Sequence, residues 1–197
     1  MGKKQKRTLR AAPKAAPVFF APTILDVAPQ LSGAMNQTLA SCGASHKILL
    51  IGEGDFSYAL GLALSLGGSN ILATSYDSLR ELNKKYADCK SILNRLKTTG
   101  AQVLHGIDGT KLPECFERLG ENKTQSFDRI VFNFPHLGGS LPKDVIKNQE
   151  MLRQFIGSSR NLLTANGEIH IALRDTLFYQ SWQIERLANS RGFELKR

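Results

Sequence analysis

The sequence predicts an α/β protein with a mostly parallel, doubly wound sheet covered by helices, as in Rossmann-like folds. Short apolar runs that are typical of buried parallel strands alternate with amphipathic stretches from Lys47 onward. Glycines follow several of these segments, at positions where strands and helices end. The chain has 197 residues, of which 42% are hydrophobic, and this suits one domain of about 150 residues plus some additional chain.

Five strands are expected over residues 47–51, 70–75, 101–107, 127–132 and 168–173. Helices are expected over residues 57–66, 78–99, 112–119, 144–163 and 180–190. Asn166-Gly167 is expected to form the turn before the fifth strand. Phe193-Glu194-Leu195 would open a sixth strand, so we expect a sheet that lacks its last strands.

Residues 1–30 are predicted to be a basic, disordered tail rich in Pro and Ala, residues 31–45 a linker or short helix, and residues 46–197 the domain. The formal net charge is +9, and residues 1–16 contain six basic residues and no acid, namely Lys3, Lys4, Lys6, Arg7, Arg10 and Lys14. Such a tail favours an RNA-contacting or nuclear-targeting arm. The alternative is a solvated tail without a specific partner.

Several classes of protein are not expected. The sequence has no run of about 18 apolar residues, which a membrane span would need. The basic N-terminus lacks the apolar segment of a secretory signal, and Lys6 stands where myristoylation needs Ser or Thr. Cys42, Cys89 and Cys115 form no C-x-x-C pair, so we expect neither a metal site nor disulfides, and a reduced intracellular compartment.

A glycine-containing loop follows the first strand and leads into a helix. Its residues Gly52, Glu53, Gly54, Asp55, Phe56 and Ser57 are the predicted cofactor-binding residues. A dinucleotide-binding loop would have a third glycine where Ser57 stands, and two acids would repel a polyphosphate. The loop therefore favours S-adenosylmethionine, and the alternative is a structural turn.

Acidic residues follow the next two strands. Asp77 suits the ribose hydroxyls of a nucleoside, and Ser78 is grouped with it, although either residue would also suit the N-cap of the next helix. Asp108 could meet an adenine amino group or could cap the short helix that follows it.

The fourth strand leads into Asn133-Phe134-Pro135-His136, which resembles the Asn/Asp-Pro-Pro-aromatic loop of amino-group methyltransferases. Asn133, Pro135 and His136 are the predicted catalytic residues, and Asn133 is also a predicted cofactor contact. Asn133 would orient a ring nitrogen, and His136 would stack on the base or accept its proton. The alternative is an ordinary turn with a surface histidine. Arg174 could contact RNA, whereas Tyr179 and Trp182 are expected in the core or the wall of the cleft.

Three segments together resemble the eukaryotic large-subunit rRNA (uridine-N3)-methyltransferase family, which has a BMT5-like domain. They are residues 48–57, 73–78 and 127–139, and the resemblance extends over about residues 46–195. It implies a class I methyltransferase fold, S-adenosyl-L-methionine as cofactor, and uridine ring nitrogen 3 as acceptor. It also implies ribosomal RNA or the pre-ribosome as partner, a nucleolar or nuclear location, no metal, and a monomer by default. Two alternatives remain open: a catalytically silent RNA-binding ribosome-assembly protein with this fold, and an NAD-dependent oxidoreductase.

Overall fold

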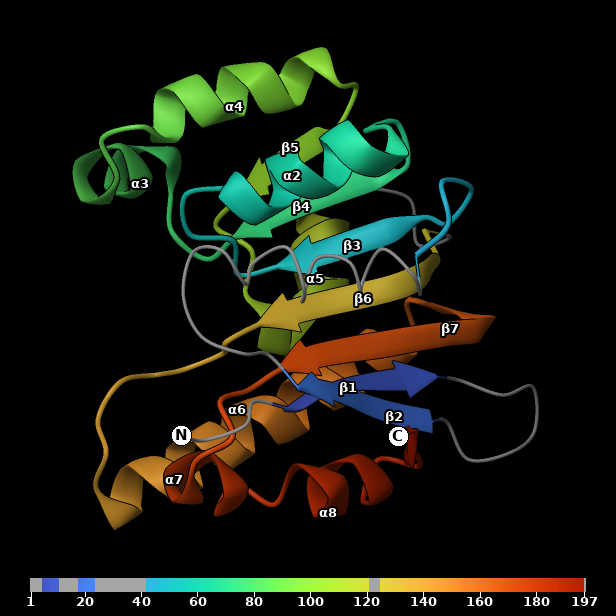
Figure 1. The fold of residues 1–197 in the computed structure, drawn as a ribbon, viewed down its shortest axis with the longest axis vertical. Coiled ribbons are helices and arrows are strands. Elements are labelled where there is room, and N and C mark those ends of the chain that lie inside the picture. The colour runs from blue at the N-terminus through green and yellow to red at the C-terminus, as the bar shows by residue number, and fades with distance from the viewer. Residues whose placement is uncertain (1–4, 11–17, 24–41, 121–124, 197) are drawn as a thin grey trace.

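A computed structural model describes residues 5–10, 18–23, 42–120 and 125–196. Its centre is five parallel strands in the order β5 (Gln102–His105), β4 (Ile71–Ser75), β3 (Ile48–Ile51), β6 (Phe127–Asn133) and β7 (Leu163–Ala172). Figure 1 shows these strands stacked side by side with their carboxyl ends at one edge. The predicted parallel α/β fold is confirmed.

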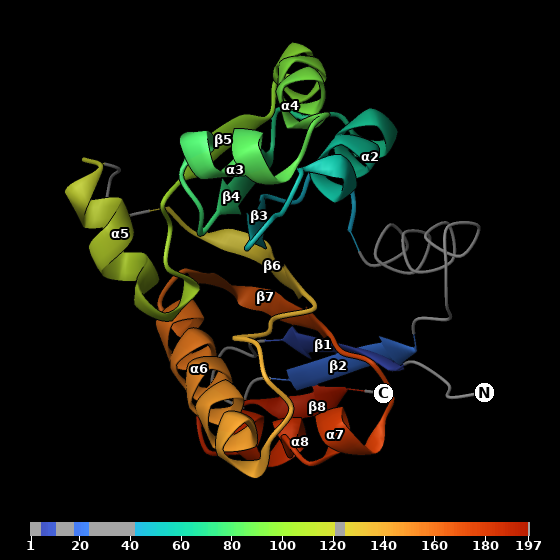
Figure 2. The same ribbon diagram turned by 90° about the vertical axis from the view of Figure 1, so that its left-hand side faces the viewer.

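The two faces of β3 belong to two separate hydrophobic cores. Leu49 and Ile51 pack with α5 (Leu112–Arg118), α6 (Pro142–Arg160) and α8 (Ile184–Asn189). Ile48 and Leu50 pack with α2 (Ser57–Leu66), α3 (Leu79–Lys85) and α4 (Cys89–Thr98). Side chains alternate across a strand, so a run of four apolar residues supplies both cores. Figure 2 shows the helices on either side of the sheet.

The helix expected over residues 78–99 is two helices, so this prediction is wrong. A capping box between Ser78 and Glu81 begins α3. Tyr86 ends it with an extended backbone (φ −131°, ψ 110°), and Asp88 precedes α4. The phenol oxygen of Tyr86 lies 3.0 Å from the position of a Cβ on Gly54. The helix therefore breaks where Tyr86 packs against the loop after β3, a contact that local periodicity does not contain.

The last two expected elements also differ from the structure. The helix expected over residues 180–190 is α7 (Leu177–Gln180) and α8, separated near Gln183, whose φ is 48°. The predicted turn Asn166-Gly167 lies inside β7. Leu163 pairs with Phe127 and Glu168 pairs with Arg129, so an advance of five residues along β7 corresponds to an advance of two along β6. The turn signal thus marks a bulge within a longer strand.

The sheet continues beyond β7 through β1 (Gln5–Arg10), β2 (Val18–Thr23) and β8 (Glu194–Lys196). β1 runs antiparallel to β2, β7 and β8. The prediction of a tail without regular structure is wrong for these two N-terminal segments, because β7 and β8 supply partners that the local proline content does not reveal. The strand predicted near residues 193–195 is β8, so the sheet does not stop after β7. The rest of residues 1–41 lies outside the described residues.

Two expected absences concern only the described residues. No described helix is long and apolar enough to cross a bilayer. The described residues contain no group of three or more His, Cys, Asp or Glu side chains placed to hold a metal ion. The three cysteines are buried and form no disulfide with one another.

Candidate functional site

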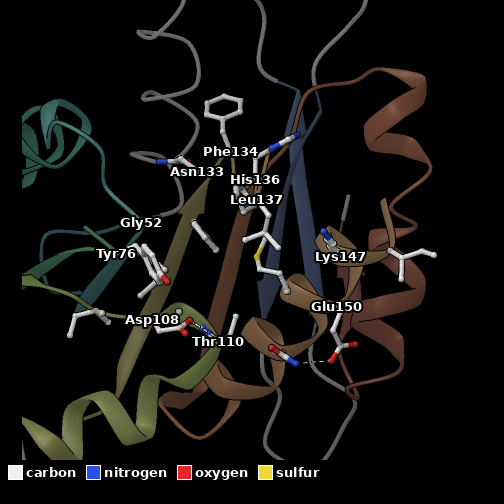
Figure 3. Close-up of a pocket in the computed structure, with 18 residues that line it drawn as sticks. Gly52, Tyr76, Asp108, Thr110, Asn133, Phe134, His136, Leu137, Lys147 and Glu150 are labelled. Carbon is white, nitrogen blue, oxygen red and sulfur yellow. Dashed lines mark hydrogen bonds between the residues drawn. The ribbon is translucent and has the colours of Figure 1, made fainter. Parts of the chain in front are cut away.

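A cavity of about 840 Å³ opens at the carboxyl ends of the parallel strands. Figure 3 shows Gly52, Tyr76, Asp108 and Thr110 along one side, with Lys147 and Glu150 of α6 across from them. Residues 134–141 connect β6 to α6, and this β6–α6 loop contributes Phe134, Pro135, His136 and Leu137 to the lining. The cavity lies where open α/β sheets bind ligands, and its size suits a small molecule.

On the strand side of the cavity, the backbone at two glycines packs closely against neighbouring side chains. Gly52 has φ +68°, and a Cβ on it would lie 2.6 Å from Cε2 of Phe132. A Cβ on Gly109, which begins η1 (Gly109–Lys111), would lie 2.8 Å from Cγ2 of Ile51. The backbone therefore lines this side of the cavity where a larger residue would not fit.

In the rest of the loop after β3, Glu53 and Phe56 turn their side chains inward, whereas Ser57 is exposed. Glu53 is buried and accepts a hydrogen bond from the Ala59 N–H at 3.0 Å, at the start of α2. Burial raises the pKa of Glu53 to about 7, against the Ala59 hydrogen bond and with a smaller contribution from Asp55. Asp55 accepts from the Ser57 N–H at 2.9 Å. Glu53 therefore faces the core, and only Asp55 remains to support the predicted repulsion of a polyphosphate.

Phe56 and Gly54 complete the same loop without reaching the cavity. Phe56 has φ 65°, is fully buried, and packs edge-on against His105 with ring centroids 5.6 Å apart. Gly54 lies against Tyr86. Of the predicted loop residues, only Gly52 is among the described residues that line the cavity.

The two candidates after β4 have different partners. Ser78 is the N-cap of α3, accepting from the Glu81 N–H at 3.3 Å while its own N–H donates to Glu81 Oε2 at 2.8 Å. The capping alternative is therefore confirmed for Ser78. The Asp77 carboxylate instead accepts from Lys85 Nζ at 2.7 Å. Its neighbour Tyr76 lines the cavity and is 70% exposed.

Asp108 performs the capping that the sequence left open and also lines the cavity. Its Oδ1 accepts from the Thr110 N–H at 2.9 Å and from Thr110 Oγ1 at 2.7 Å. Both of these bonds use the same carboxylate oxygen, so they do not occupy Oδ2. A cap and a ligand contact are therefore compatible at this position.

The β6–α6 loop is held from behind by α6. The buried side chain of Asn148 accepts from the Leu137 N–H at 2.9 Å and donates to the Asp144 carbonyl at 2.7 Å. Asp144 accepts from the Leu141 N–H at 3.0 Å. With its backbone fixed this way, the loop exposes the side chains of Phe134 (φ 51°, 44% exposed), His136 and Leu137, whereas Pro135 is buried.

The predicted catalytic residues Asn133, Pro135 and His136 all line the cavity. Asn133 ends β6 opposite Ala172 of β7, and Pro135 is buried. His136 is exposed, with its ring 5.6 Å from that of Trp182 and 5.9 Å from that of Tyr179. The structure therefore brings the three residues together at the site.

One hydrogen bond determines which ring nitrogen of His136 accepts and which one donates. Its Nδ1 lies 2.6 Å from the Gly138 backbone nitrogen. A backbone N–H can only donate, so Nδ1 accepts, and in the neutral ring Nε2 carries the proton. His136 would thus offer a ligand a donor, and it could accept a proton only by releasing Gly138. This geometry favours hydrogen-bond donation over the predicted proton acceptance.

Two further expectations concern the segment after β7. Trp182 is fully buried and Tyr179 partly buried in the aromatic group beside His136, as expected for core or cleft-wall residues. Arg174 is exposed and is not among the described residues that line the cavity.

Sequence reasoning missed the side of the cavity that α6 forms. The missed residues of α6 are Ile146, Lys147, Glu150, Met151 and Gln154, and Tyr76 and Thr110 were missed on the strand side. Lys147, Glu150 and Gln154 are spaced three and four residues apart, which is a polar stripe at helical spacing. Ile146 is an apolar residue directly beside this stripe, and it is 67% exposed. An apolar residue displaced toward a polar stripe is the signal that could have indicated this surface.

Comparison with known proteins bears on the family and the fold. The family model "BMT5-like: rRNA (uridine-N3-)-methyltransferase BTM5-like" matches residues 49–197. The chain is 37% identical over 159 residues to an uncharacterized Arabidopsis thaliana protein, covering 77% of this chain and 74% of that protein. It is 28% identical over 203 residues to the Saccharomyces cerevisiae 25S rRNA (uridine(2634)-N(3))-methyltransferase, covering 76% of this chain and 60% of that enzyme. The crystal structure of TrmN from Thermus thermophilus has a similar fold, with a TM-score of 0.53 at 18% identity, covering 83% of this chain and 48% of TrmN.

Proposed function

The chain belongs to the BMT5-like rRNA (uridine-N3)-methyltransferase family, and on that premise we propose that it methylates ring nitrogen 3 of a uridine in large-subunit ribosomal RNA. The methyl donor would be S-adenosylmethionine, which the methyltransferase fold implies. The observation that supports this most directly is the cavity in which Gly52, Asp108 and the Asn133–His136 segment meet. The yeast relative, named as an rRNA uridine-N3 methyltransferase, supports the choice of acceptor.

The strand side of the cavity suits the proposed cofactor. Gly52 and Gly109 line the cavity, and both pack so closely against Phe132 or Ile51 that a Cβ would not fit. Asp77 and Asp108, at the ends of β4 and β5, would bind the ribose hydroxyls and the adenine amino group. When bound, S-adenosylmethionine supplies a methyl carbon activated by a sulfonium. Asp77 is not itself among the described residues that line the cavity, but Lys85 Nζ lies 2.7 Å from its carboxylate and holds this side chain beside Tyr76, which does line it.

The β6–α6 loop suits a nucleobase acceptor. The imide N–H of uridine must lose its proton, and the negative charge then spreads over the two flanking carbonyl oxygens. The Asn133 amide and the Nε2–H of His136 would donate to such an oxygen and so stabilise the anion. Phe134 is exposed at the rim, where it would stack on the base. Water is left as the acceptor of the proton, because Nδ1 of His136 is bonded to Gly138.

The test combines a cellular and a purified assay. Nucleosides of large-subunit rRNA, measured by mass spectrometry with and without the protein, should show loss of 3-methyluridine in its absence. Calorimetry of the purified protein should show binding of S-adenosylmethionine and not of NAD. Unchanged 3-methyluridine together with no methyl transfer in vitro would refute the proposal and favour the silent ribosome-assembly alternative.

A nucleolar or nuclear location and contact with the pre-ribosome belong to the same proposal. The basic residues near the N-terminus support it, because they attract phosphate backbones. Fluorescence microscopy of the tagged full chain checks the location. A signal excluded from the nucleus would contradict it.

A further inference from the structure

A second, smaller cavity adjoins the one already described. It measures about 310 Å³ and lies between α6 and α8. Both cavities are lined by Ile146 and Glu150, so they meet on the surface of α6. We call the smaller cavity the α6–α8 groove. A ligand that filled the main cavity and extended past Ile146 would enter this groove.

The groove differs from the main cavity in its chemistry. Its polar lining comes from Gln149, Arg153, Gln183, Arg186 and Ser190, and Glu150 is the acid among its lining residues. The Arg153 guanidinium donates to the Glu150 carboxylate at 2.7 Å and thereby lowers the pKa of Glu150. That acid is therefore ionised and matched by Arg153 at neutral pH.

Two cations remain beside this matched pair. Arg186 donates to the neutral Gln183 side chain at 3.1 Å, so its charge stays available. Lys147 lines the main cavity next to Ile146, and among the described residues it has no ion-pair partner. Lys147 thus lines one of the two adjoining cavities and Arg186 lines the other, and both side chains are exposed.

We propose that the α6–α8 groove binds the single-stranded RNA that flanks the acceptor uridine, with Lys147 and Arg186 contacting its phosphates. This rests on the proposed function. A base that enters the main cavity must leave its stack, so its neighbouring nucleotides lie at the rim as single strand. Guanidinium and amide groups suit such RNA, since they bond phosphates, 2′-hydroxyls and base edges. The continuity of the two cavities at Ile146 gives the strand a path.

The experiment measures RNA affinity as a function of salt. Lys147→Ala, Arg186→Ala and the double variant are made in the full chain and titrated with a fluorescent, uridine-containing single-stranded oligoribonucleotide. Each lost phosphate contact should reduce the slope of log affinity against log salt by about 0.7. Lys90→Ala is the matched control, because Lys90 is an exposed cation on α4, at the opposite end of the molecule from α6 and α8 (Figure 1).

The outcomes separate this proposal from the proposed function. A reduced slope in Lys147→Ala and in Arg186→Ala, with the wild-type slope in Lys90→Ala and with unchanged S-adenosylmethionine binding in Arg186→Ala, whose side chain lines the groove, supports the proposal. Wild-type affinity and slope in the double variant, or no RNA binding by the wild-type chain, overturns it. If the slopes change as expected while the wild-type chain transfers no methyl group, the groove stands and the proposed activity fails.

Discussion

The loop after β3 and the β6–α6 loop occupy the same edge of the sheet but use their side chains in opposite ways. In the first, Glu53 and Phe56 point into the protein, and the loop offers its backbone to the cavity. In the second, Asn148 and Asp144 hold the backbone from behind, and the side chains of Phe134, His136 and Leu137 are exposed. Side-chain changes in the first loop should therefore act on stability, and those in the second on turnover.

The largest effect is expected in the second loop, from Asn133→Ala. Loss of one oriented donor at a developing negative charge costs about 10²–10³-fold in turnover. Binding of S-adenosylmethionine and the melting temperature should stay close to wild type. Methyl transfer to RNA is measured with labelled cofactor, and calorimetry provides the control. Turnover within twofold of wild type would remove Asn133 from the catalytic site.

The next comparison uses His136→Gln and His136→Ala to separate donation from proton acceptance. The amide nitrogen of glutamine can replace Nε2–H as a donor but cannot act as a base. If His136 donates, turnover should fall by about a hundredfold in the alanine variant and by less than about tenfold in the glutamine variant. Single-turnover rates measure both. Equal, complete inactivation of the two variants would show instead that the histidine accepts the proton.

In the first loop, Glu53→Gln should change the pH dependence of stability. The pKa of Glu53 is about 7 in the folded protein and 4.5 ordinarily, so the folded state keeps this proton up to a higher pH than the unfolded state does. The stabilisation that comes from protonated Glu53 is fully present below pH 4.5 and is lost as the pH rises through 7. The loss amounts to about 3 kcal/mol of unfolding free energy. The amide of the Glu53→Gln variant cannot ionise, so this loss should disappear.

Chemical denaturation at several pH values between about 4.5 and 8 measures that effect. Glu114→Gln is the control, because Glu114 is an exposed glutamate on α5. It should keep the wild-type profile. The assignment fails if Glu53→Gln loses as much stability between pH 4.5 and about 7 as the wild-type chain does.

The smallest effects distinguish two neighbours in sequence, Asp77 and Ser78. Asp77→Ala should weaken S-adenosylmethionine binding about tenfold or more, because a hydrogen bond to a charged group contributes about 1.5–3 kcal/mol. Ser78→Ala should leave the affinity unchanged and destabilise the protein by about 1 kcal/mol through loss of the cap. Calorimetry and thermal unfolding of both variants test the pair. The same affinity in both would remove Asp77 from the cofactor site.

Much of the fold was predictable because its signals are local. The apolar stretch from Ser57 to Leu66, followed by Gly67, predicted α2 at its observed bounds. The break at Tyr86 was not predictable, since it depends on packing against Gly54. The strands β1 and β2 were missed for a similar reason, because their pairing partners β7 and β8 lie far away in the sequence.

The site was predictable only where the sheet itself places residues. Strand ends converge at one edge, so Gly52, Asp108 and Asn133 were found from their positions after strands. Glu53 and Phe56 belong to the same motif, but their side chains support the loop from inside. The α6 residues were missed because the direction in which a helix faces depends on its packing, which the sequence shows only as a displaced apolar residue, Ile146.

The pairing of β1 and β2 with β7 has a consequence for shortened forms of the protein. Residues 49–197 carry the family match, so a fragment starting near Lys47 would be a natural choice for study. That fragment would leave unpaired backbone along the outer edge of β7, from Glu168 to Ala172, where β1 and β2 now bond. Exposed apolar strand edges recruit other chains. Such a fragment should therefore self-associate in light scattering, whereas the full chain protects this edge with its own N-terminal residues.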